Sequence, residues 1–451
     1  SFISTMGLCP ASAARVIVGG CMLHLVLGTI YMWGNISIYV TSYLRGHQGD
    51  SVTSSTSLAI FSSSLFFQAI FMPVGGLLEK AQGPRRCGYV AVVCVASGMF
   101  LSSQCESVVA LCMAQALYGA GIGIGYIAPL SCGYKHLPNR KGMVSGLIVG
   151  GFGAGSFVFN MVATQWVNPD NEKIPDGEDY YPSDSDVATA IPGMYRLLAF
   201  CYLCLGMLGS SLLSDPEEEV PPPIVAEAED ETEAARKASR EFSGQVTTPL
   251  IAGKAREVKD FDTRTMMRTS NFLILITCFF CTGTGGMFLS ATYKNFADSP
   301  EHLKDQGDHF FAYVGSIGSV CNGLSRVFWG VLADRIGPFN TLIIMATLFP
   351  LIFLVYNVAV DNPYIYATCV CMLFWCYGGN FALFPTITAK LFGVKNNGTN
   401  YGCVFIFFGA ITAFLIWGIG IEGDSLNFED INWGIFCIGA LGLILAITLK
   451  V

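Results

Sequence analysis

The sequence predicts an all-α integral membrane protein with twelve transmembrane helices in two six-helix bundles. Its composition, its long apolar stretches and an internal repeat support this prediction. Of the 451 residues, 52% are hydrophobic and 13% are charged, whereas soluble proteins carry about 25% charged residues. The mean hydropathy is +0.52. A chain with so little polar surface is expected to lie in a bilayer, and it has no basic stripe that would indicate binding to nucleic acid.

The apolar stretches are long enough to cross a bilayer, which takes about 20 residues of α-helix. We expect them to be helical because the hydrocarbon offers no partners for the backbone polar groups of an open strand. The predicted spans are residues 14–42, 54–79, 87–105, 107–133, 142–167, 190–213, 269–293, 309–333, 340–360, 363–389, 399–421 and 431–450.

Short loops on one side of these spans contain most of the loop lysines and arginines, which indicates that this side is cytosolic. Both termini are then expected to be cytosolic as well. The basic residues of these loops are Lys80, Arg85, Arg86, Lys135, Arg140, Lys141, Arg335, Lys390 and Lys395.

Residues 214–268 are rich in charge and proline and contain no span. We therefore predict an N-terminal six-helix bundle at residues 1–213, a charged cytosolic linker at 214–268 and a C-terminal six-helix bundle at 269–451. This composition is typical of a solvated tether. The alternative is that a helix in the linker binds an accessory protein.

Two sequence patterns occur once in each half of the chain. The triplet IAP at 127–129 recurs as LFP at 383–385, and GGLLEKAQGPRR at 75–86 recurs as GVLADRIGPFN at 330–340. Two copies of a six-span unit are implied. Transporter folds are commonly built from such repeats, with the substrate site near the midplane where the halves meet.

The repeated loops resemble the signature loop of the major facilitator superfamily. In such a loop, a carboxylate at a helix end can pair with a cation or a helix N-terminus in one conformation and release it in another. A purely structural salt bridge is the alternative. The candidate gating residues are Gly76, Glu79, Gly83 and Arg85 in the first loop, and Gly330, Asp334, Arg335 and Gly337 in the second.

Ionisable residues inside a span are rare and often functional. The two main cases are His24, which we expect to be a hydrogen-bonded structural histidine, and Arg326. Asn322 lies one helical turn before Arg326 and on the same face. Because no Asp or Glu lies in the middle of a predicted span, a substrate carboxylate is the expected partner of this guanidinium. Satisfaction by helix carbonyls and water is the alternative.

Aromatic and amide side chains in the spans could line a cavity around this arginine, with hydroxyl and indole groups as hydrogen-bond donors. The predicted substrate-binding set is Arg326, Asn322, Tyr31, Trp33, Tyr126, Trp375, Tyr377 and Asn380, with Tyr118 and Tyr401 as further aromatic candidates. The alternating glycines between residues 119 and 125 are expected to serve close helix packing.

Several motifs resemble the oxalate/formate antiporter family and, more loosely, the monocarboxylate transporters. They are GTIYMWG (28–34), GAGIGIGYIAPL (119–130), LPNRKGMVSG (137–146), NGLSRVFWGVLAD (322–334), YGGNFALFPTITAKLFG (377–393) and NNGTNYG (396–402). The resemblance implies the major facilitator fold, a role for Arg326 in binding a substrate carboxylate, and cavity positions for Tyr31 and Trp375.

Two departures from these families bear on the substrate. The span-eleven lysine of oxalate exchangers has no counterpart in residues 401–414, and Asn322 stands where proton-coupled monocarboxylate transporters have an aspartate. The resemblance therefore implies carriage of a small monocarboxylate such as pyruvate, lactate or formate, by antiport or symport, with the mode of coupling open.

A zwitterionic substrate such as an amino acid is the alternative within transport, and a non-transporting receptor or accessory subunit is the alternative outside it. We expect no enzyme activity, cofactor or metal, because the spans contain no nucleophile–base pair or metal-ligand cluster. The expected partners are a small carboxylate and the lipid bilayer. We expect a multi-pass protein of the plasma membrane rather than of an organelle membrane.

Overall fold

The structure is a computed structural model that describes residues 11–170, 172, 174–175, 180–216, 260–297, 303, 308–358, 361–422 and 428–449. All regular structure in these ranges is helical. Of the predicted linker, residues 217–259 lie outside the described part of the chain, and so does any docking helix among them.

The N-terminal helices occupy every span predicted before residue 213. They are α2 (Ala11–Leu27), the 3-10 segment η1 (Gly28–Met32), α3 (Trp33–Gln48), α4 (Ser54–Gln82), α5 (Pro84–Ser102), α6 (Val108–Tyr126), α7 (Ala128–His136), α8 (Lys141–Val167), α9 (Asp186–Thr189) and α10 (Ile191–Ser211). The first span consists of α2, η1 and α3 in succession. The fourth is divided between α6 and α7 just before Pro129, which lacks the backbone N–H needed to continue the helix.

The C-terminal helices occupy the remaining predicted spans. They are α12 (Thr263–Met266), α13 (Ser270–Ala297), α14 (Asp308–Ile336), α15 (Pro338–Val358), α16 (Pro363–Phe392), α17 (Asn397–Glu422) and α18 (Phe428–Thr448). Pro385, the repeat counterpart of Pro129, lies inside the continuous helix α16. The two copies of the repeat therefore differ at this point.

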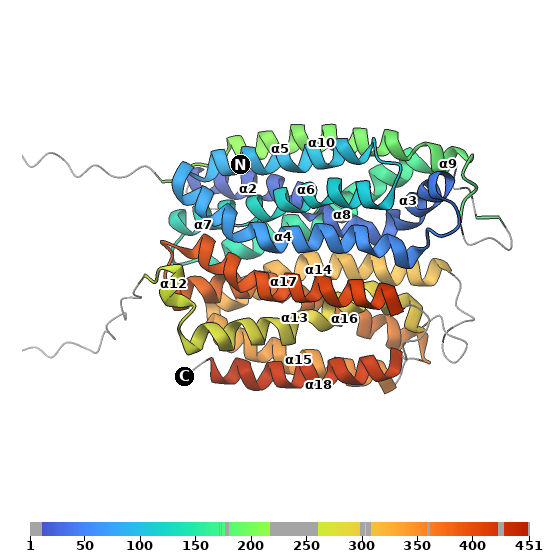
Figure 1. Cartoon of the computed structure of the whole chain (residues 1–451). Helices are drawn as coiled ribbons and strands as arrows, with labels where there is room; N and C mark the ends of the chain where they lie inside the picture. The colour runs from blue at the N-terminus through green and yellow to red at the C-terminus, as the bar shows by residue number, and fades with distance from the viewer. Residues whose placement is uncertain are drawn as a thin grey trace, which may run out of the picture.

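The long helices run roughly side by side, with α2 to α10 in one layer and α13 to α18 in the other (Figure 1). In the described residues, nine helical segments are long and apolar enough to cross a membrane. Helix α14 is not among them, although it has 29 residues. This helix carries Asn322, Arg326 and Asp334, whose polarity lowers its hydropathy.

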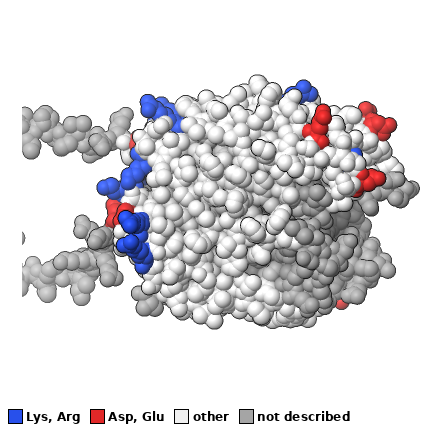
Figure 2. Space-filling model, in the orientation of Figure 1, with Lys and Arg blue, Asp and Glu red and all other residues white. Residues whose placement is uncertain are grey.

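Charged side chains gather at the two ends of the helices (Figure 2). One end, here called the basic end, carries Lys80, Arg85, Lys135, Arg140, Arg335 and Lys390 at or near the ends of their helices. The start of α2 lies there, because Arg15 donates a hydrogen bond to Ser214 at 2.8 Å, and α18 ends there as well (Figure 1). The excess of positive charge makes this the end expected to face the cytosol.

The alternating glycines of α6 let this helix approach two neighbours closely. A Cβ atom on Gly119 or Gly123 would collide with the backbone of α4, and one on Gly121 would lie 2.7 Å from the Val95 nitrogen of α5. The glycine run therefore packs helices, as its position within a span predicted.

Replacement of Gly119 by Ala should destabilise the protein, because the Ser64 carbonyl of α4 occupies the space that the methyl group needs. Overpacking of this kind costs about 1–3 kcal/mol. Gly418→Ala on α17 is the matched control, since in the described residues no atom beyond its own stretch of helix lies within 4 Å of its added Cβ. Thermal unfolding of the purified variants measures the difference, and equal midpoints for the two would contradict the packing.

Candidate functional site

Arg326 lies at the interface between the two halves with no exposed surface. Its Nε and Nη2 atoms donate to Oδ1 of Asn322 at 3.2 and 2.9 Å, as their spacing on one helix predicts. Its Nη1 donates to the Val149 carbonyl of α8 at 3.0 Å. The guanidinium thus joins the C-terminal α14 to the N-terminal α8 through neutral acceptors.

The positive charge of Arg326 has no carboxylate partner among the described residues. The ion pairs found there are Arg45–Asp50, Lys135–Glu79 and Lys135–Asp215, all near helix ends. A guanidinium has five N–H donors, and the hydrogen bonds to Asn322 and Val149 use three of them. The neutral hydroxyl of Tyr31 also interacts with the guanidinium. A buried charge without a counter-ion is strongly unfavourable, so this position would favour an anion.

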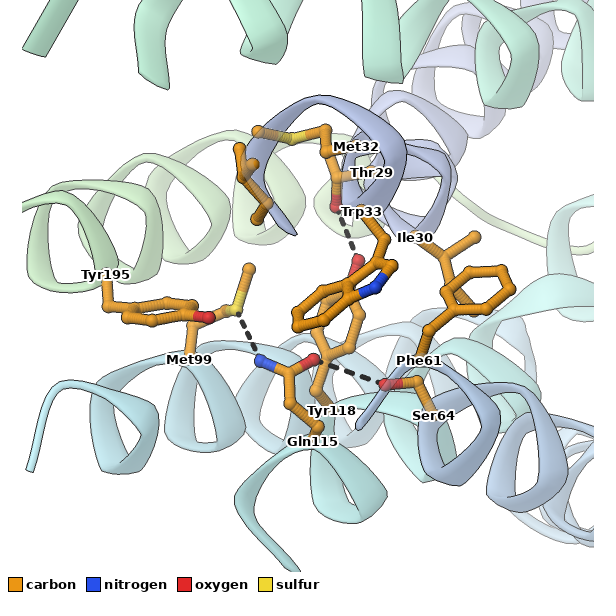
Figure 3. Close-up of a pocket in the computed structure, with 11 residues that line it drawn as sticks. Thr29, Ile30, Met32, Trp33, Phe61, Ser64, Met99, Gln115, Tyr118 and Tyr195 are labelled. Atoms are coloured by element: carbon orange, nitrogen blue, oxygen red, sulfur yellow. Dashed lines mark hydrogen bonds between the residues drawn. The ribbon is translucent and has the colours of Figure 1, made fainter. Parts of the chain in front are cut away.

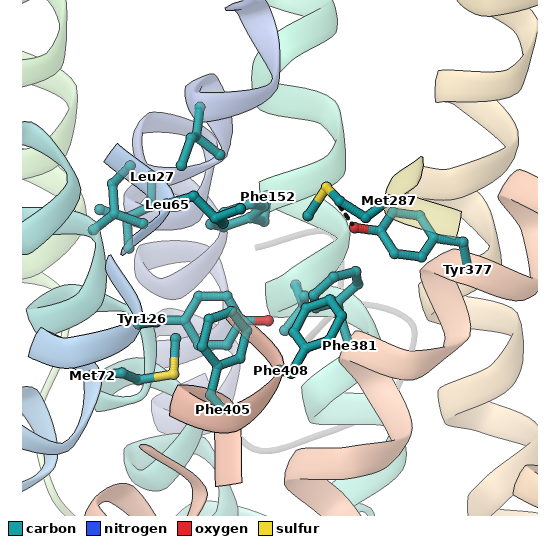
Figure 4. Packing of buried hydrophobic residues seen from close by; sticks show 14 of the residues in the cluster. Leu27, Leu65, Met72, Tyr126, Phe152, Met287, Tyr377, Phe381, Phe405 and Phe408 are labelled. Carbon is teal, nitrogen blue, oxygen red and sulfur yellow. Dashed lines mark hydrogen bonds between the residues drawn. The ribbon is translucent and has the colours of Figure 1, made fainter. Parts of the chain in front are cut away.

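Aromatic rings from both halves surround the guanidinium. Its central carbon lies 5.5 Å from the ring centre of Phe152 on α8 and 4.8 Å from that of Phe381 on α16. Cation–π contacts of this kind contribute about 0.5–2 kcal/mol each. Figure 4 shows these two rings with Tyr126, Tyr377, Phe405 and Phe408 where the halves meet. These rings make much of the described surroundings of the guanidinium apolar, beside the polar groups of Asn322, Val149 and the tyrosines.

The three tyrosines of the predicted set lie in this cluster, and so does Tyr401, one of the further candidates. The hydroxyls of Tyr31 and Tyr377, from opposite halves, are 3.4 Å apart, and Tyr31 also meets Phe152 edge-on at 5.8 Å. Tyr126 stacks on Tyr401 with ring centres 6.2 Å apart. The hydroxyls of Tyr126 and Tyr401 are buried and have no hydrogen-bond partner among the described residues. These hydroxyls are groups that a bound carboxylate could engage.

The structure does not bring Asn380 and Trp375 into contact with Arg326. The Asn380 amide binds Thr282 of α13 through both its oxygen, at 2.7 Å, and its nitrogen, at 3.1 Å. The Trp375 ring lies 5.3 Å from Phe328, whose side chain is 48% exposed on the outer surface of the bundle. In this conformation, both residues connect helices within the C-terminal half.

Trp33 lies in a separate cavity inside the N-terminal half, together with Tyr118 (Figure 3). Tyr118 shares a hydrogen bond with Thr29 at 2.8 Å, and Gln115 bonds to Ser64 and Ser102 at 3.2 and 3.0 Å. The cavity volume is about 20 Å³, which is room for one water molecule.

Three residues that contact Arg326 escaped the sequence prediction: Val149, Phe152 and Phe381. Their side chains are apolar and gave no sign of their position. Helix α8 nevertheless held a usable signal in the glycines at 142, 146 and 150, which lie on one face at four-residue spacing. A Cβ on Gly146 would lie 2.6 Å from the Arg326 carbonyl oxygen, so this face marks the contact with α14.

The second repeated loop closes the basic end between the two halves. The Asp334 carboxylate of α14 accepts hydrogen bonds from the backbone N–H groups of Gly142, at 2.8 Å, and Met143, at 2.7 Å. It thereby caps the N-terminus of α8, where the helix dipole favours a negative charge. The backbones of Gly330 and Gly142 are in direct contact beside it. The exposed Arg335 follows, and Gly337 turns the chain with φ of 89°.

The first repeated loop has a different arrangement. The Glu79 carboxylate pairs with Lys135 of its own half at 3.1 Å, and Lys135 also binds Asp215 at 2.8 Å. Contact with the other half is made by Lys80, which donates to Asn396 at 2.7 Å, and by Gly76, which packs directly against the start of α17.

The residues after Glu79 have local roles. Gly83 turns the chain with φ of 84°, as Gly337 does in the second loop, and only glycine adopts this conformation readily. The Arg85 Nε donates to the Leu213 carbonyl at 3.1 Å. The two predicted gating loops are thus related in sequence and backbone but not in the partners of their carboxylates.

Comparisons with known proteins agree with this fold. Relatives include the "Apicoplast pyruvate carrier 1" of Toxoplasma gondii, 29% identical with 94% of this chain and 88% of that protein covered. Another is the "Oxalate:formate antiporter" of Oxalobacter formigenes, 24% identical with 90% and 83% covered.

Among solved structures, the proton:xylose symporter XylE superposes with a TM-score of 0.69 at 13% identity, covering 96% of this chain and 95% of that one. FucP in its outward conformation gives a TM-score of 0.65 at 14% identity, with 97% and 99% covered. Residues 188–420 match the family model of the Major Facilitator Superfamily. The chain therefore belongs to the Major Facilitator Superfamily of membrane transporters.

Proposed function

We propose that this transporter carries small monocarboxylates, such as pyruvate, lactate or formate, by alternating access. The observation that supports this most is the buried charge of Arg326, whose partners among the described residues are neutral and whose hydrogen bonds to Asn322 and Val149 leave two of its five N–H donors. A carboxylate can take both of these donors at once in the planar geometry that a guanidinium favours.

The number of charges supports a single carboxylate. Residues 401–414 of α17 contain no charged side chain that could hold a second carboxylate. The rings of Phe152 and Phe381 provide an apolar wall for a short carbon chain. The names of the two relatives, a pyruvate carrier and an oxalate:formate antiporter, agree with a small carboxylate substrate.

A zwitterionic substrate such as an amino acid is a weaker candidate. Its ammonium group would need a carboxylate or several carbonyl oxygens, whereas the described neighbours of the guanidinium are an amide, one carbonyl and aromatic rings. A non-transporting receptor on the same scaffold would not need the paired contacts of Asp334 and Gly142 that close one end of the bundle.

The plasma membrane, expected from the sequence, remains our proposal for the location. Two relatives in Toxoplasma gondii are named apicoplast carriers, which supports an organelle membrane as the alternative. Fluorescence imaging of the tagged protein in its own cells distinguishes the two locations.

Arg326→Ala should abolish uptake of labelled pyruvate by proteoliposomes, and Arg326→Lys should reduce it strongly. Lysine keeps the charge but cannot present two parallel donors. Loss of a charge-assisted bidentate contact costs about 2 kcal/mol, or roughly a thirtyfold drop in apparent affinity. Arg196→Lys on the exposed side of α10 is the matched control and should transport normally. Full transport by both Arg326 variants would contradict the assignment.

Competition experiments should show which class of solute binds. Unlabelled formate, lactate and pyruvate should inhibit uptake of labelled pyruvate, and neutral amino acids should not, because no acidic group faces the guanidinium in the described residues. The same panel should raise the unfolding temperature of the purified protein through preferential binding to the folded state. Stabilisation by amino acids alone would favour the zwitterionic substrate, and no stabilisation by any of the compounds would favour the receptor.

The two gating loops should respond differently to neutralisation. Asp334→Asn weakens the cap on α8 by about 1 kcal/mol, which corresponds to roughly fivefold faster opening of its first turn. Hydrogen exchange followed by mass spectrometry should show this increase at residues 141–146. Glu79→Gln should leave exchange at the start of α17 unchanged, because Glu79 pairs within its own half. Equal effects of the two substitutions would contradict the asymmetry.

A further inference from the structure

His24 is a fully buried imidazole on α2, close to the substrate site but outside the set that contacts Arg326. Its Nε2 lies 2.9 Å from the backbone carbonyl oxygen of Tyr126. A carbonyl oxygen only accepts hydrogen bonds, so Nε2 carries a hydrogen. Nδ1 has no partner among the described residues. In the neutral ring this nitrogen has a free lone pair that can take a proton.

Phe152 contacts both this imidazole and the guanidinium. The ring centres of His24 and Phe152 are 5.8 Å apart in an edge-on contact, and the Arg326 central carbon is 5.5 Å from the same phenylalanine. Tyr126 covers another side of the imidazole, with ring centres 4.9 Å apart. A titratable group and a charge without a counter-ion in the described structure thus share contact with one aromatic ring.

The other helices that pack on α2 add no nearby charge in the described residues. Helix α8 contributes Phe152, and α6 contributes Tyr126, whose hydroxyl is neutral at physiological pH. Helices α7 and α10 meet α2 at its glycines through Pro129 and Gly209. The segment η1 contributes Tyr31, whose ring meets Phe152 edge-on.

The charged and titratable side chains of α7 and α10 lie away from His24. Lys135 pairs with Glu79 and Asp215, and His136 bonds to the Ser214 carbonyl, all at the basic end. Arg196 is exposed near the start of α10. Arg326 is therefore the charge that acts on His24 from within the bundle.

We propose that His24 binds a proton at Nδ1 when a carboxylate binds to Arg326, so that the two are carried together. This inference rests on the proposed function. An empty site has one positive charge on Arg326, which opposes a second charge on the nearby imidazole. A bound carboxylate cancels the first charge and removes this opposition, so that binding of proton and substrate is mutually favourable.

The net charge of the site determines whether this coupled transport moves charge across the membrane. With a carboxylate and a proton both bound, the site again has one net positive charge, equal to that of the empty site. The loaded and empty protein then reorient with the same charge, and net uptake is electroneutral. His24 would thus supply the proton site that Asn322 cannot, because an amide does not titrate.

The test uses the full-length protein in liposomes with an acidic exterior and labelled pyruvate. Electroneutral symport should accumulate pyruvate about tenfold inside for each unit of pH difference. His24→Gln should lose this accumulation but continue to exchange external labelled pyruvate for internal unlabelled pyruvate. The glutamine amide can still donate to the Tyr126 carbonyl but cannot bind a proton. Liposomes without protein correct for passive entry of the acid.

His136→Gln is the matched control, because His136 also contacts a carbonyl oxygen, that of Ser214, but lies at the basic end, away from the aromatic cluster. It should retain both accumulation and exchange. Accumulation by His24→Gln at the unsubstituted level would overturn the proposal. Loss of both activities would also overturn it, by giving His24 a structural role. If the unsubstituted protein exchanges pyruvate but does not accumulate it, the proton site is refuted and the proposed substrate is not. If the unsubstituted protein does not exchange pyruvate at all, the proposed substrate is refuted.

Discussion

The buried charge of Arg326 is the constraint on which the centre of this protein depends. It requires close approach of α8, and the glycine face of that helix lets the Val149 carbonyl come within 3.0 Å of the guanidinium. It also explains the aromatic rings of Phe152 and Phe381 on either side, because they contribute attraction without neutralising the charge. If an Asp or Glu side chain of the protein paired with Arg326 in the described part of this cluster, it would neutralise the charge. The arginine would then have little attraction for a bound anion.

The proposed substrate site and the closed end lie on the same pair of helices. Arg326 binds Val149, and two turns further along α14 the carboxylate of Asp334 caps α8 at Gly142. Any movement that separates α14 from α8 must break both contacts. A carboxylate bound to the remaining N–H donors would compete with the Val149 carbonyl for the guanidinium and so weaken one of them. This gives binding a direct physical route to the opening of the basic end.

The sequence predicted the fold well because hydrocarbon restricts the backbone severely, and it predicted the Asn322–Arg326 pair because residues four apart share a helix face. Helix rotation was harder to predict. Spans such as α2 and α6 are apolar on all sides, so the hydrophobic pattern does not show which side meets the other half. Trp33 and Tyr31 illustrate this, since they lie two residues apart yet belong to a separate cavity and to the central cluster, respectively. The different partners of Glu79 and Asp334 depend on tertiary contacts that a shared motif cannot specify.

The low hydropathy of α14 has a consequence for assembly of the protein in the membrane. Alone in a bilayer, this helix would expose the guanidinium of Arg326 to lipid, which is strongly unfavourable. The groups that contact this guanidinium come from both sides of α14 in the sequence. Val149 and Phe152 are synthesised before α14, and Phe381 after it. The N-terminal half therefore acts as a template on which α14 becomes stable. Separately expressed halves would have to find each other before the C-terminal half could hold its own central helix.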